Sequence, residues 1–392
     1  MGDAVSQGHP DLMAKIAEEI RSSGPITFAR FMELALYEPT HGYYMRGGSG
    51  QNKIGWDGDY YTSSDVHPVF ALALARQIHQ LDEILERPDP FTLVEMGPGT
   101  GALARDLLTA CAKLDHSLAT RLHCVLVERS PAFRELQGSA MAALPSSVGR
   151  VTWVDSLQAL ASNSVVGLLL SNELVDAFPV HRVTVDRGEL KEIHVDVEEG
   201  RFCERLLPLS TLELSHYLER MAIKLEDGQV AEINLQALTW MGEVARVLTK
   251  GLVITVDYGH NAQDLYSSDR RRGTLLCYHR HTVSDDPYQR IGLQDMTAHV
   301  DFTSLAHQGE AAGLSVTGFT NQMGFLAGLR IEEILGDLDP HSGEYRSVVE
   351  LIRPHGMGRT FKILIQHKGI EPPELDGLAY KPFFASALTA PA

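Results

Sequence analysis

The chain has little cysteine: four residues in 392, with no Cys-x-x-Cys pair among them. The thiols lie far apart and mostly in apolar segments: Cys111, Cys124, Cys203 and Cys277. This spacing excludes a disulfide-stapled scaffold and a thiolate zinc site. His279 and His281 could share one face of a strand, but no nearby acid or thiol completes a ligand set. We therefore predict no metal site.

Positive charge, long apolar runs and leader sequences are also lacking. The formal net charge is −17, from 51 acidic and 34 basic residues, which argues against binding to nucleic acid or to an anionic membrane. No segment is apolar over the length that crosses a bilayer, so we expect no membrane insertion. The first residues lack both regions of a signal peptide. We expect a cytoplasmic protein.

Internal repeats and low-complexity tracts are absent, which excludes a solenoid and a linker-like chain. Only the last dozen residues have the composition of a loose tail. At 392 residues the chain can bury a large core and exceeds one minimal domain. These features indicate a globular enzyme or binding protein.

The most informative pattern that is present is an apolar strand followed by glycines at alternate positions, Thr92-Leu-Val-Glu-Met-Gly-Pro-Gly-Thr-Gly101. Gly97, Gly99 and Gly101 lack Cβ atoms, so the backbone could turn sharply and approach a ligand closely. The pattern fits a dinucleotide, S-adenosylmethionine, or a turn without a ligand. Glu95 favours the methyl donor, because a carboxylate here would attract a methionine ammonium and repel a pyrophosphate.

Four further apolar runs end on polar residues: 122–127 before Glu128, 150–154 before Asp155 and Ser156, 165–170 before Asn172 and Glu173, and 252–256 before Asp257. Together with 92–96 they predict a doubly wound, parallel α/β sheet whose ligand lies beyond the carboxyl ends of the strands. Glu128 is the candidate for binding ribose hydroxyls. The alternative is a solvated acid beside a helix cap.

Additional parts surround this sheet. Residues 11–21 and 26–37 predict helices, and the long aromatic segment 38–64 predicts a lid or substrate-binding loop. A hairpin turn at 186–189 and a helix at 211–225 indicate an inserted block. We therefore expect an N-terminal helical and lid region at 1–88, a core made of 89–179 and 231–368, an inserted hairpin–helix block at 180–230, and a tail at 369–392.

Five motifs, in order, resemble those of the MidA-type methyltransferases: Asp59-Tyr-Tyr-Thr-Ser-Ser-Asp-Val, Val94-Glu-Met-Gly-Pro-Gly-Thr-Gly101, Ser171-Asn-Glu-Leu-Val-Asp-Ala-Phe-Pro179, Asp257-Tyr-Gly-His260 and Leu293-Gln-Asp-Met-Thr-Ala-His-Val-Asp-Phe302. The resemblance extends from about residue 10 to 368. This family includes a mitochondrial arginine methyltransferase that assists the assembly of respiratory complex I.

The resemblance implies a class I methyltransferase fold, which is Rossmann-like, with a seven-stranded sheet whose last strand, 359–366, is antiparallel. It also implies S-adenosyl-L-methionine as the cofactor. The residues expected around that cofactor are Gly97, Gly99 and Gly101 under the methionine, Glu95 near its ammonium, Glu128 at the ribose, Asp155 and Ser156 at the adenine, and Thr62 and Ser63 in the N-terminal motif. Thr62 and Ser63 could equally cap the following helix.

An arginine acceptor would stay protonated at neutral pH, so its charge must be drawn aside to leave one nitrogen nucleophilic. Glu173 and Asp176 could do this from the end of the fourth strand, with Asn172 orienting the donor or the acceptor. Residues 176–179 could instead be only a turn. His260 and His299 are alternative bases, and each could equally be structural.

We therefore predict an S-adenosylmethionine-dependent methyltransferase that acts on an arginine in a basic protein segment. A subunit of respiratory complex I is the partner that the resemblance implies, and the mitochondrial matrix is the location if the source is eukaryotic. Glu173, Asp176, Asp257 and Asp301 predict a negative edge that attracts such a segment. A small-molecule O- or N-methyltransferase and a donor-binding assembly chaperone stay open, as does a monomer or a homodimer.

Overall fold

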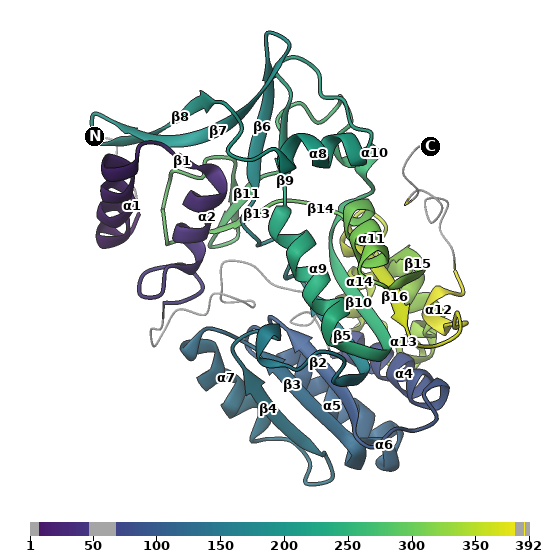
Figure 1. Cartoon of the computed structure of the whole chain (residues 1–392). Helices are drawn as coiled ribbons and strands as arrows, with labels where there is room; N and C mark the ends of the chain where they lie inside the picture. The colour runs from purple at the N-terminus through teal and green to yellow at the C-terminus, as the bar shows by residue number, and fades with distance from the viewer. Residues whose placement is uncertain (1–7, 47–67, 381–387, 389–392) are drawn as a thin grey trace.

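A mixed sheet forms the centre of the computed structural model, which describes residues 8–46, 68–380 and 388 (Figure 1). Its continuous path runs in the order β15-β16-β10-β5-β2-β3-β4. The strands are β2 Phe91–Met96, β3 Leu122–Val127, β4 Arg150–Val154, β5 Val165–Asn172, β10 Leu248–His260, β15 Ser315–Asn321 and β16 Phe361–Lys368. An eighth strand, β14 Val300–Asp301, pairs with β10. The expected α/β class is confirmed, and the sheet has one short strand more than expected.

The neighbouring pairs among β4, β3, β2, β5 and β10 are parallel, whereas β16 is antiparallel to both β10 and β15. Parallel strands buried on both faces are typically continuous apolar runs. Strand β2 is buried along its whole length, and β5 nearly so. Because their carboxyl ends meet at one edge, polar residues that follow these strands are brought together there.

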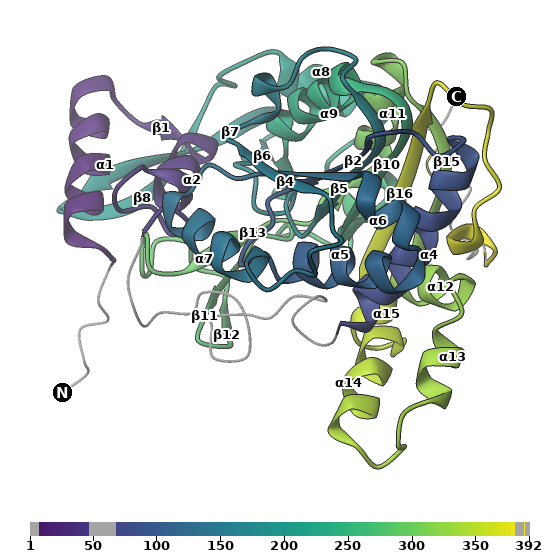
Figure 2. The same ribbon diagram turned by 90° about the horizontal axis from the view of Figure 1, so that it is seen from below.

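Helices cover both faces of the sheet (Figure 2). One core packs strand side chains such as Leu93 and Leu168 against helices α4, α5 and α12 to α14. The other packs Val94 and Leu169 against α9 and α11. The bounds are α4 Val69–Ile84, α5 Ala102–Leu114, α6 His116–Arg121, α7 Pro131–Met141, α9 Leu235–Val247, α11 Phe302–Ala311, α12 Gln322–Gly328, α13 Ile331–Gly336, α14 Gly343–Ile352 and α15 Met357–Thr360.

The N-terminal segment and the inserted block share a second sheet. Its strands are β1 Ile26–Thr27, β6 His181–Asp186, β7 Glu189–Glu198, β8 Arg201–Leu207 and β9 Val230–Ile233. β1 pairs with β7, so chain segments about 170 residues apart are joined directly. The predicted hairpin is confirmed by β6 and β7. Helices α1 Pro10–Ser23, α2 Phe28–Tyr37, α8 Glu213–Arg220 and α10 Ala262–Leu265 accompany this sheet (Figure 1).

A third, small sheet is made of β11 Leu276–His279, β12 Thr282–Ser284 and β13 Asp295–Thr297. Two short 3-10 helices complete the described chain, Leu157–Ala159 and Asp376–Leu378. All four thiols are free; three are buried, and Cys203 is partly exposed. Within the described ranges, none of the helices has the length and apolar character that a membrane span requires.

Candidate methyl-transfer site

A cavity of about 320 Å³ lies at the carboxyl edge of the central sheet. We call it the donor cavity. Its walls come from the ends of β2, β3 and β5, the segment after β4, helix α9 and the segment that follows α2. Among the cofactor-binding residues expected from sequence, five line it: Gly97, Gly99, Glu128, Asp155 and Ser156. Glu173 lines it as well.

The glycine loop has the backbone that its sequence predicts. Gly97, Gly99 and Gly101 have φ values of 68°, 51° and 82°, in the left-handed region that glycine adopts without strain. A Cβ on Gly97 would lie 2.7 Å from Leu174 Cδ1. Gly101 caps the start of α5 and is not among the residues that line the donor cavity.

Glu128 follows β3 and is held by a network that the sequence analysis missed. Its Oε1 accepts a hydrogen bond from the backbone amide of Ser130 at 2.7 Å, and its Oε2 accepts one from Gln137 Nε2 at 3.3 Å. The same Gln137 nitrogen donates to Gly99 O at 2.8 Å. Burial raises the pKa of Glu128, although these hydrogen bonds oppose the rise. Gln137 therefore ties the acid to the glycine loop.

Asp155 and Ser156 line the donor cavity directly after the end of β4. The Asp155 side chain is 82% exposed, and its Oδ1 pairs with Arg134 Nη2 at 2.5 Å. Arg134 is further fixed by its Nε, which donates to Glu128 O at 2.8 Å. The ends of β3 and β4 are thus linked through one guanidinium.

Glu95 is buried in strand β2, two residues before the glycine loop. Its side chain is 3% exposed and is not part of the cavity wall. Burial raises its pKa to about 8. Its Oε2 has no hydrogen-bond partner among the described residues. A buried carboxyl of this kind can accept a cationic group that reaches it. Thr62 and Ser63 lie outside the described residues.

The end of β5 carries the acids expected to act on the acceptor. Glu173 has a φ of 51°, which is uncommon for a residue with a side chain. Its Oε2 accepts a hydrogen bond from Tyr258 Oη at 3.0 Å, and Asn172 Nδ2 donates to its Oε1 at 3.2 Å. The left-handed backbone and the two donors fix the position of this carboxylate, and Glu173 lines the donor cavity.

Asp257 was expected at an open negative edge, and this is wrong: the side chain is fully buried. Its Oδ2 accepts backbone hydrogen bonds from Leu174, Val175 and Asp176, at 3.2, 2.9 and 3.4 Å. It therefore fixes the turn that carries Glu173. Asp301 was expected at the same edge and is also buried, because it caps α11 and accepts from Tyr217 Oη at 2.6 Å.

A second, smaller cavity of about 30 Å³ adjoins the first; we call it the acceptor cavity. It shares Tyr44 and Glu173 with the donor cavity. Its remaining lining residues are Asp176, Tyr258, Tyr278, Asp295 and Thr297. Tyr44 Oη donates to Asp295 Oδ1 at 2.8 Å. Burial, and after it the charges of Asp257, Asp295 and Glu173, raise the pKa of Asp176. Three carboxyl groups and three tyrosines thus surround one small space.

The two histidines expected as alternative bases lie elsewhere. Their ring centroids are 5.3 Å apart, and neither residue lines the donor or the acceptor cavity. His299 lines a separate small cavity beside Asp301. Burial, followed by the charge of Arg270, lowers the pKa of His260 to about 3 and that of His299 to about 4. The two histidines lie outside both cavities and are weak bases, so neither suits the role of the base in methyl transfer.

A glycine loop, an acid after β3 and a second acidic cavity at one sheet edge define an α/β enzyme with a nucleotide-type cofactor. Residues 73–320 match the family described as "Putative S-adenosyl-L-methionine-dependent methyltransferase", and the chain belongs to this family. A solved structure of a COG1565 superfamily member from Burkholderia thailandensis, bound to S-adenosyl-homocysteine, is 32% identical. It superimposes with a TM-score of 0.85, and the match covers 95% of each chain.

Curated relatives extend the similarity to animals. The Drosophila melanogaster protein arginine methyltransferase NDUFAF7 homolog, mitochondrial, is 28% identical over 94% of this chain and 87% of its own length. The Mus musculus protein arginine methyltransferase NDUFAF7, mitochondrial, is 27% identical, with 89% of this chain and 83% of the relative covered. The predicted methyltransferase class and its cofactor, S-adenosyl-L-methionine, are confirmed.

The residues present fit this cofactor. A Cβ on Gly97 would press on Leu174, which lines the donor cavity beside it, so the loop needs glycine at this point of the cavity wall. Glu128 offers carboxylate oxygens inside the donor cavity, as ribose hydroxyls require. The buried Oε2 of Glu95 lacks a partner among the described residues, which suits an ammonium.

Proposed function

We propose that the chain methylates the guanidinium of an arginine side chain in a protein. The acceptor cavity carries this proposal, because it places Glu173, Asp176 and Asp295 around a space that shares two wall residues with the donor cavity. A planar cation is the group that carboxylates and aromatic rings recognise best in such a space.

On the donor side, we assign the residues as the family resemblance implies. Gly97, Gly99 and Gly101 would lie under the methionine part, with Glu95 near the ammonium. Glu128 would bind the ribose hydroxyls, supported by Gln137. Asp155 and Ser156, which line the same cavity, would lie beside the adenine. When bound, S-adenosyl-L-methionine supplies an activated methyl group on its sulfonium.

On the acceptor side, the cavity of about 30 Å³ is far smaller than the donor cavity of about 320 Å³. In this proposal a guanidinium enters as the cavity walls move apart. Tyr44, which follows the turn after α2, donates to Asp295, so this hydrogen bond is one that an entering cation would replace. The cavity would then hold the arginine side chain between carboxylates on two sides.

The chemistry requires alignment and removal of one proton. Carboxylates that bind two guanidinium nitrogens draw positive charge toward those atoms and leave the third nitrogen more nucleophilic. Glu173 lines both cavities, so we assign it the contact with the reacting nitrogen and the acceptance of its proton. Asp176 would hold the guanidinium, and Asn172 would orient Glu173. Proximity supplies much of the remaining rate.

The names of the animal relatives, which are arginine methyltransferases, support an arginine acceptor. In this proposal the seven-strand path of the sheet corresponds to the class I methyltransferase core, formed by 89–179 and 231–368. Residues 1–88 would serve as helical and lid region, 180–230 as an inserted block and 369–392 as a tail. A basic segment of a complex I subunit remains the partner that the family resemblance implies. The mitochondrial relatives favour a matrix location over the cytoplasmic one for a eukaryotic source.

The proposal is tested by incubating the protein with methyl-labelled S-adenosyl-L-methionine and a host-cell extract, followed by hydrolysis of the labelled fraction. We expect labelled methylarginine in protein, and none with Glu173→Gln. Label only in small molecules would establish the small-molecule methyltransferase instead. Firm donor binding without any labelled product would support the donor-binding chaperone, and labelled protein without methylarginine would refute the arginine acceptor.

A further inference from the structure

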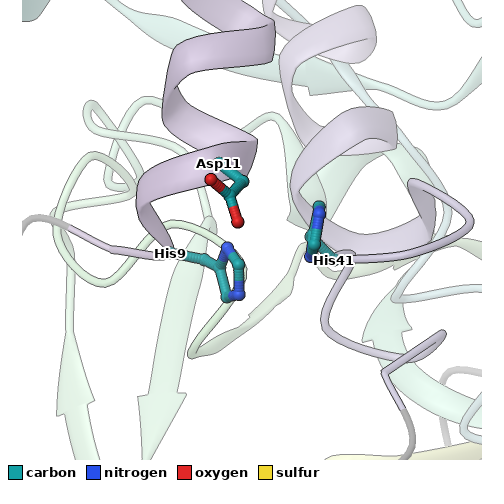
Figure 3. Close-up of side chains that lie close together, drawn as sticks. All are labelled: His9, Asp11 and His41. Carbon is teal, nitrogen blue, oxygen red and sulfur yellow. The ribbon is translucent and has the colours of Figure 1, made fainter.

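A cluster of three metal-ligating side chains lies away from the methyl-transfer site (Figure 3). His9 precedes helix α1, Asp11 belongs to its first turn, and His41 lies in the turn after α2. One potential ligand atom from each of the three lies within 4.8 Å of the other two. None of these residues takes part in the donor or acceptor cavity.

The backbone at both histidines is fixed by long-range contacts. The amide of His9 donates to Ile291 O at 2.8 Å, and Gly8 forms a bridge with Ile291. Gly292 packs between the two histidines, since a Cβ there would lie 2.9 Å from His41 O and 3.6 Å from His9 Cβ. The loop at 291–292 therefore holds the two histidine-bearing segments together.

The buried acid Glu38 also fixes the turn that carries His41. Glu38 is 5% exposed, and its Oε2 accepts from the amides of Thr40 at 2.9 Å and His41 at 2.7 Å. Its Oε1 pairs with Lys15 Nζ of α1 at 2.7 Å. Glu38 therefore links the turn that carries His41 to helix α1, which begins directly after His9. These contacts fix the backbone that carries the two histidines.

The side chains carry a second indication. The imidazole rings of His9 and His41 are stacked, with centroids 4.3 Å apart and planes at 25°. His9 Nδ1 is buried and has no hydrogen-bond partner among the described residues. A buried ring nitrogen without a partner costs free energy, which a bound cation would remove. Asp11 is exposed and can turn toward the rings.

We propose that His9, Asp11 and His41 bind one divalent cation of the zinc type. Two imidazoles and one carboxylate suit first-row divalent ions, and zinc takes such a set with water as the fourth ligand. A tetrahedral site with ligand bonds of about 2.0–2.1 Å needs ligand atoms roughly 3.4 Å apart. The ligand atoms would reach that spacing by rotation of the partly exposed His41 ring out of its stacking on His9 and of the exposed Asp11 carboxylate.

A cation here would link α1 to the turn that leads into the site. Tyr44 follows His41 by three residues and lines both the donor and the acceptor cavity. Binding would therefore stiffen a wall that the methyl acceptor passes.

This metal site departs from the expectation of no metal, which weighed only His279 and His281, because His9 and His41 are far apart in sequence. The inference does not depend on the identity of the methyl acceptor.

The test is calorimetric titration of untagged full-length protein with Zn²⁺, together with thermal unfolding with and without the ion. We expect one Zn²⁺ per chain and a higher unfolding temperature in its presence. His9→Ala and His41→Ala should each lower the affinity about a hundredfold and abolish the thermal shift. His281→Ala removes an exposed histidine that lies two residues from another, His279. It should change neither the affinity for Zn²⁺ nor the thermal shift.

Asp11→Asn serves as a variant that will fold, because Asp11 is exposed and makes no contact that the core requires. We expect at least a tenfold weaker affinity for Zn²⁺ in this variant. Wild-type protein without saturable binding would overturn the proposal and leave only a stacked histidine pair. Affinity unchanged in both His41→Ala and Asp11→Asn would overturn it equally.

Discussion

The hydroxyl of Tyr258 donates a hydrogen bond to Glu173 Oε2 at 3.0 Å. Tyr258 lies near the end of strand β10, and Glu173 directly follows the adjacent parallel strand β5. Glu173 lines the donor and the acceptor cavity, whereas Tyr258 lines only the acceptor cavity. The carboxylate proposed to accept the substrate proton is therefore held from the acceptor side.

Tyr258→Phe removes this hydrogen bond and keeps the ring, which packs on Phe361 with centroids 4.2 Å apart. One hydrogen bond is worth about 1 kcal/mol. We therefore expect kcat to fall roughly fivefold, with donor affinity unchanged, in steady-state assays and calorimetry. Tyr217→Phe removes a buried hydroxyl that donates to Asp301 outside both cavities, so it should leave kcat unchanged. Equal loss of kcat in both variants would contradict a specific link to Glu173.

The buried acid Glu95 should make donor affinity depend on pH. Its pKa is about 8 in the free protein, so at pH 6 the side chain is neutral, and binding of a cationic ammonium requires release of its proton. We expect affinity to rise between pH 6 and pH 7.5, with proton release seen by calorimetry in buffers of different ionisation enthalpy. Glu95→Gln should remove this slope, whereas Glu232→Gln, another buried acid with a raised pKa, should not.

The same pKa shift predicts how stability changes with pH. An unfolded chain loses the Glu95 proton near pH 4.5, and the folded chain keeps it up to about pH 8. The folded state then binds more protons in this window, so the free energy of unfolding falls as pH rises through it. Denaturant titrations should show that the fall is smaller in Glu95→Gln.

Gly99→Val should abolish donor binding while the protein stays folded. Gly99 has a φ of 51° and lines the donor cavity, so a branched side chain would strain the loop and enter the cofactor space. Gly313→Val is the matched control: its φ is 91°, and no heavy atom outside its immediate chain neighbours lies within 4 Å of its ideal Cβ. The control should lose similar stability, about 1–2 kcal/mol, and retain donor affinity in calorimetry. Donor binding by a folded Gly99→Val variant would refute the loop assignment.

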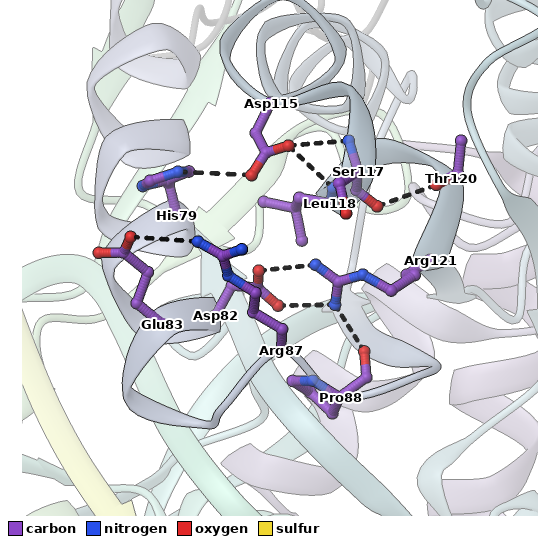
Figure 4. Close-up of polar contacts among 10 residues, drawn as sticks. All are labelled: His79, Asp82, Glu83, Arg87, Pro88, Asp115, Ser117, Leu118, Thr120 and Arg121. Carbon is purple, nitrogen blue, oxygen red and sulfur yellow. Dashed lines mark hydrogen bonds and ion pairs between the residues drawn. The ribbon is translucent and has the colours of Figure 1, made fainter.

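The stability of the core can be tested at a buried ion pair between α4 and α6 (Figure 4). Arg121 contacts both oxygens of Asp82, at 2.9 and 2.8 Å, and also donates to Pro88 O at 2.6 Å. Asp82 is 1% and Arg121 13% exposed, so Asp82→Ala would leave a largely buried guanidinium without its carboxylate and with only the hydrogen bond to Pro88 O. We expect a loss of about 3–5 kcal/mol in chemical denaturation.

The control for this prediction lies one residue further along α4. Glu83 and Arg87 form an exposed pair at 3.8 Å in the same group of contacts (Figure 4). Glu83→Ala should therefore cost about 0–1 kcal/mol. If Asp82→Ala were no more destabilising than Glu83→Ala, the ion pair would not hold the two helices together.

The sequence predicted the parts of the site that depend on local pattern. The glycine loop and Glu128 each directly follow an apolar strand, so their place at the sheet edge follows from strand direction. Asp257 and Asp301 lie in strands β10 and β14, yet both are buried, because they accept backbone hydrogen bonds from neighbouring segments. A strand end therefore predicts position along the sheet, and not whether the side chain faces solvent.

The rest of the site depends on contacts between distant segments. Tyr44 meets Asp295 across 251 residues, and no periodicity reports such a pairing. Gln137 lies in the second turn of helix α7, and the residues around it in the sequence show only an ordinary helical pattern. One signal was available, since Asp295 belongs to the Leu293 to Phe302 motif that carried the family resemblance.

The central claim is that Glu173 acts on the acceptor and not on the donor. The most direct measurement compares single-turnover methyl transfer and donor affinity in wild type and Glu173→Gln, with labelled S-adenosyl-L-methionine and the protein substrate found in extract. The account predicts that transfer slows by about a hundredfold or more, while the Kd for the donor changes less than threefold. Near-normal transfer, or a loss of donor affinity equal to the loss of rate, would contradict it.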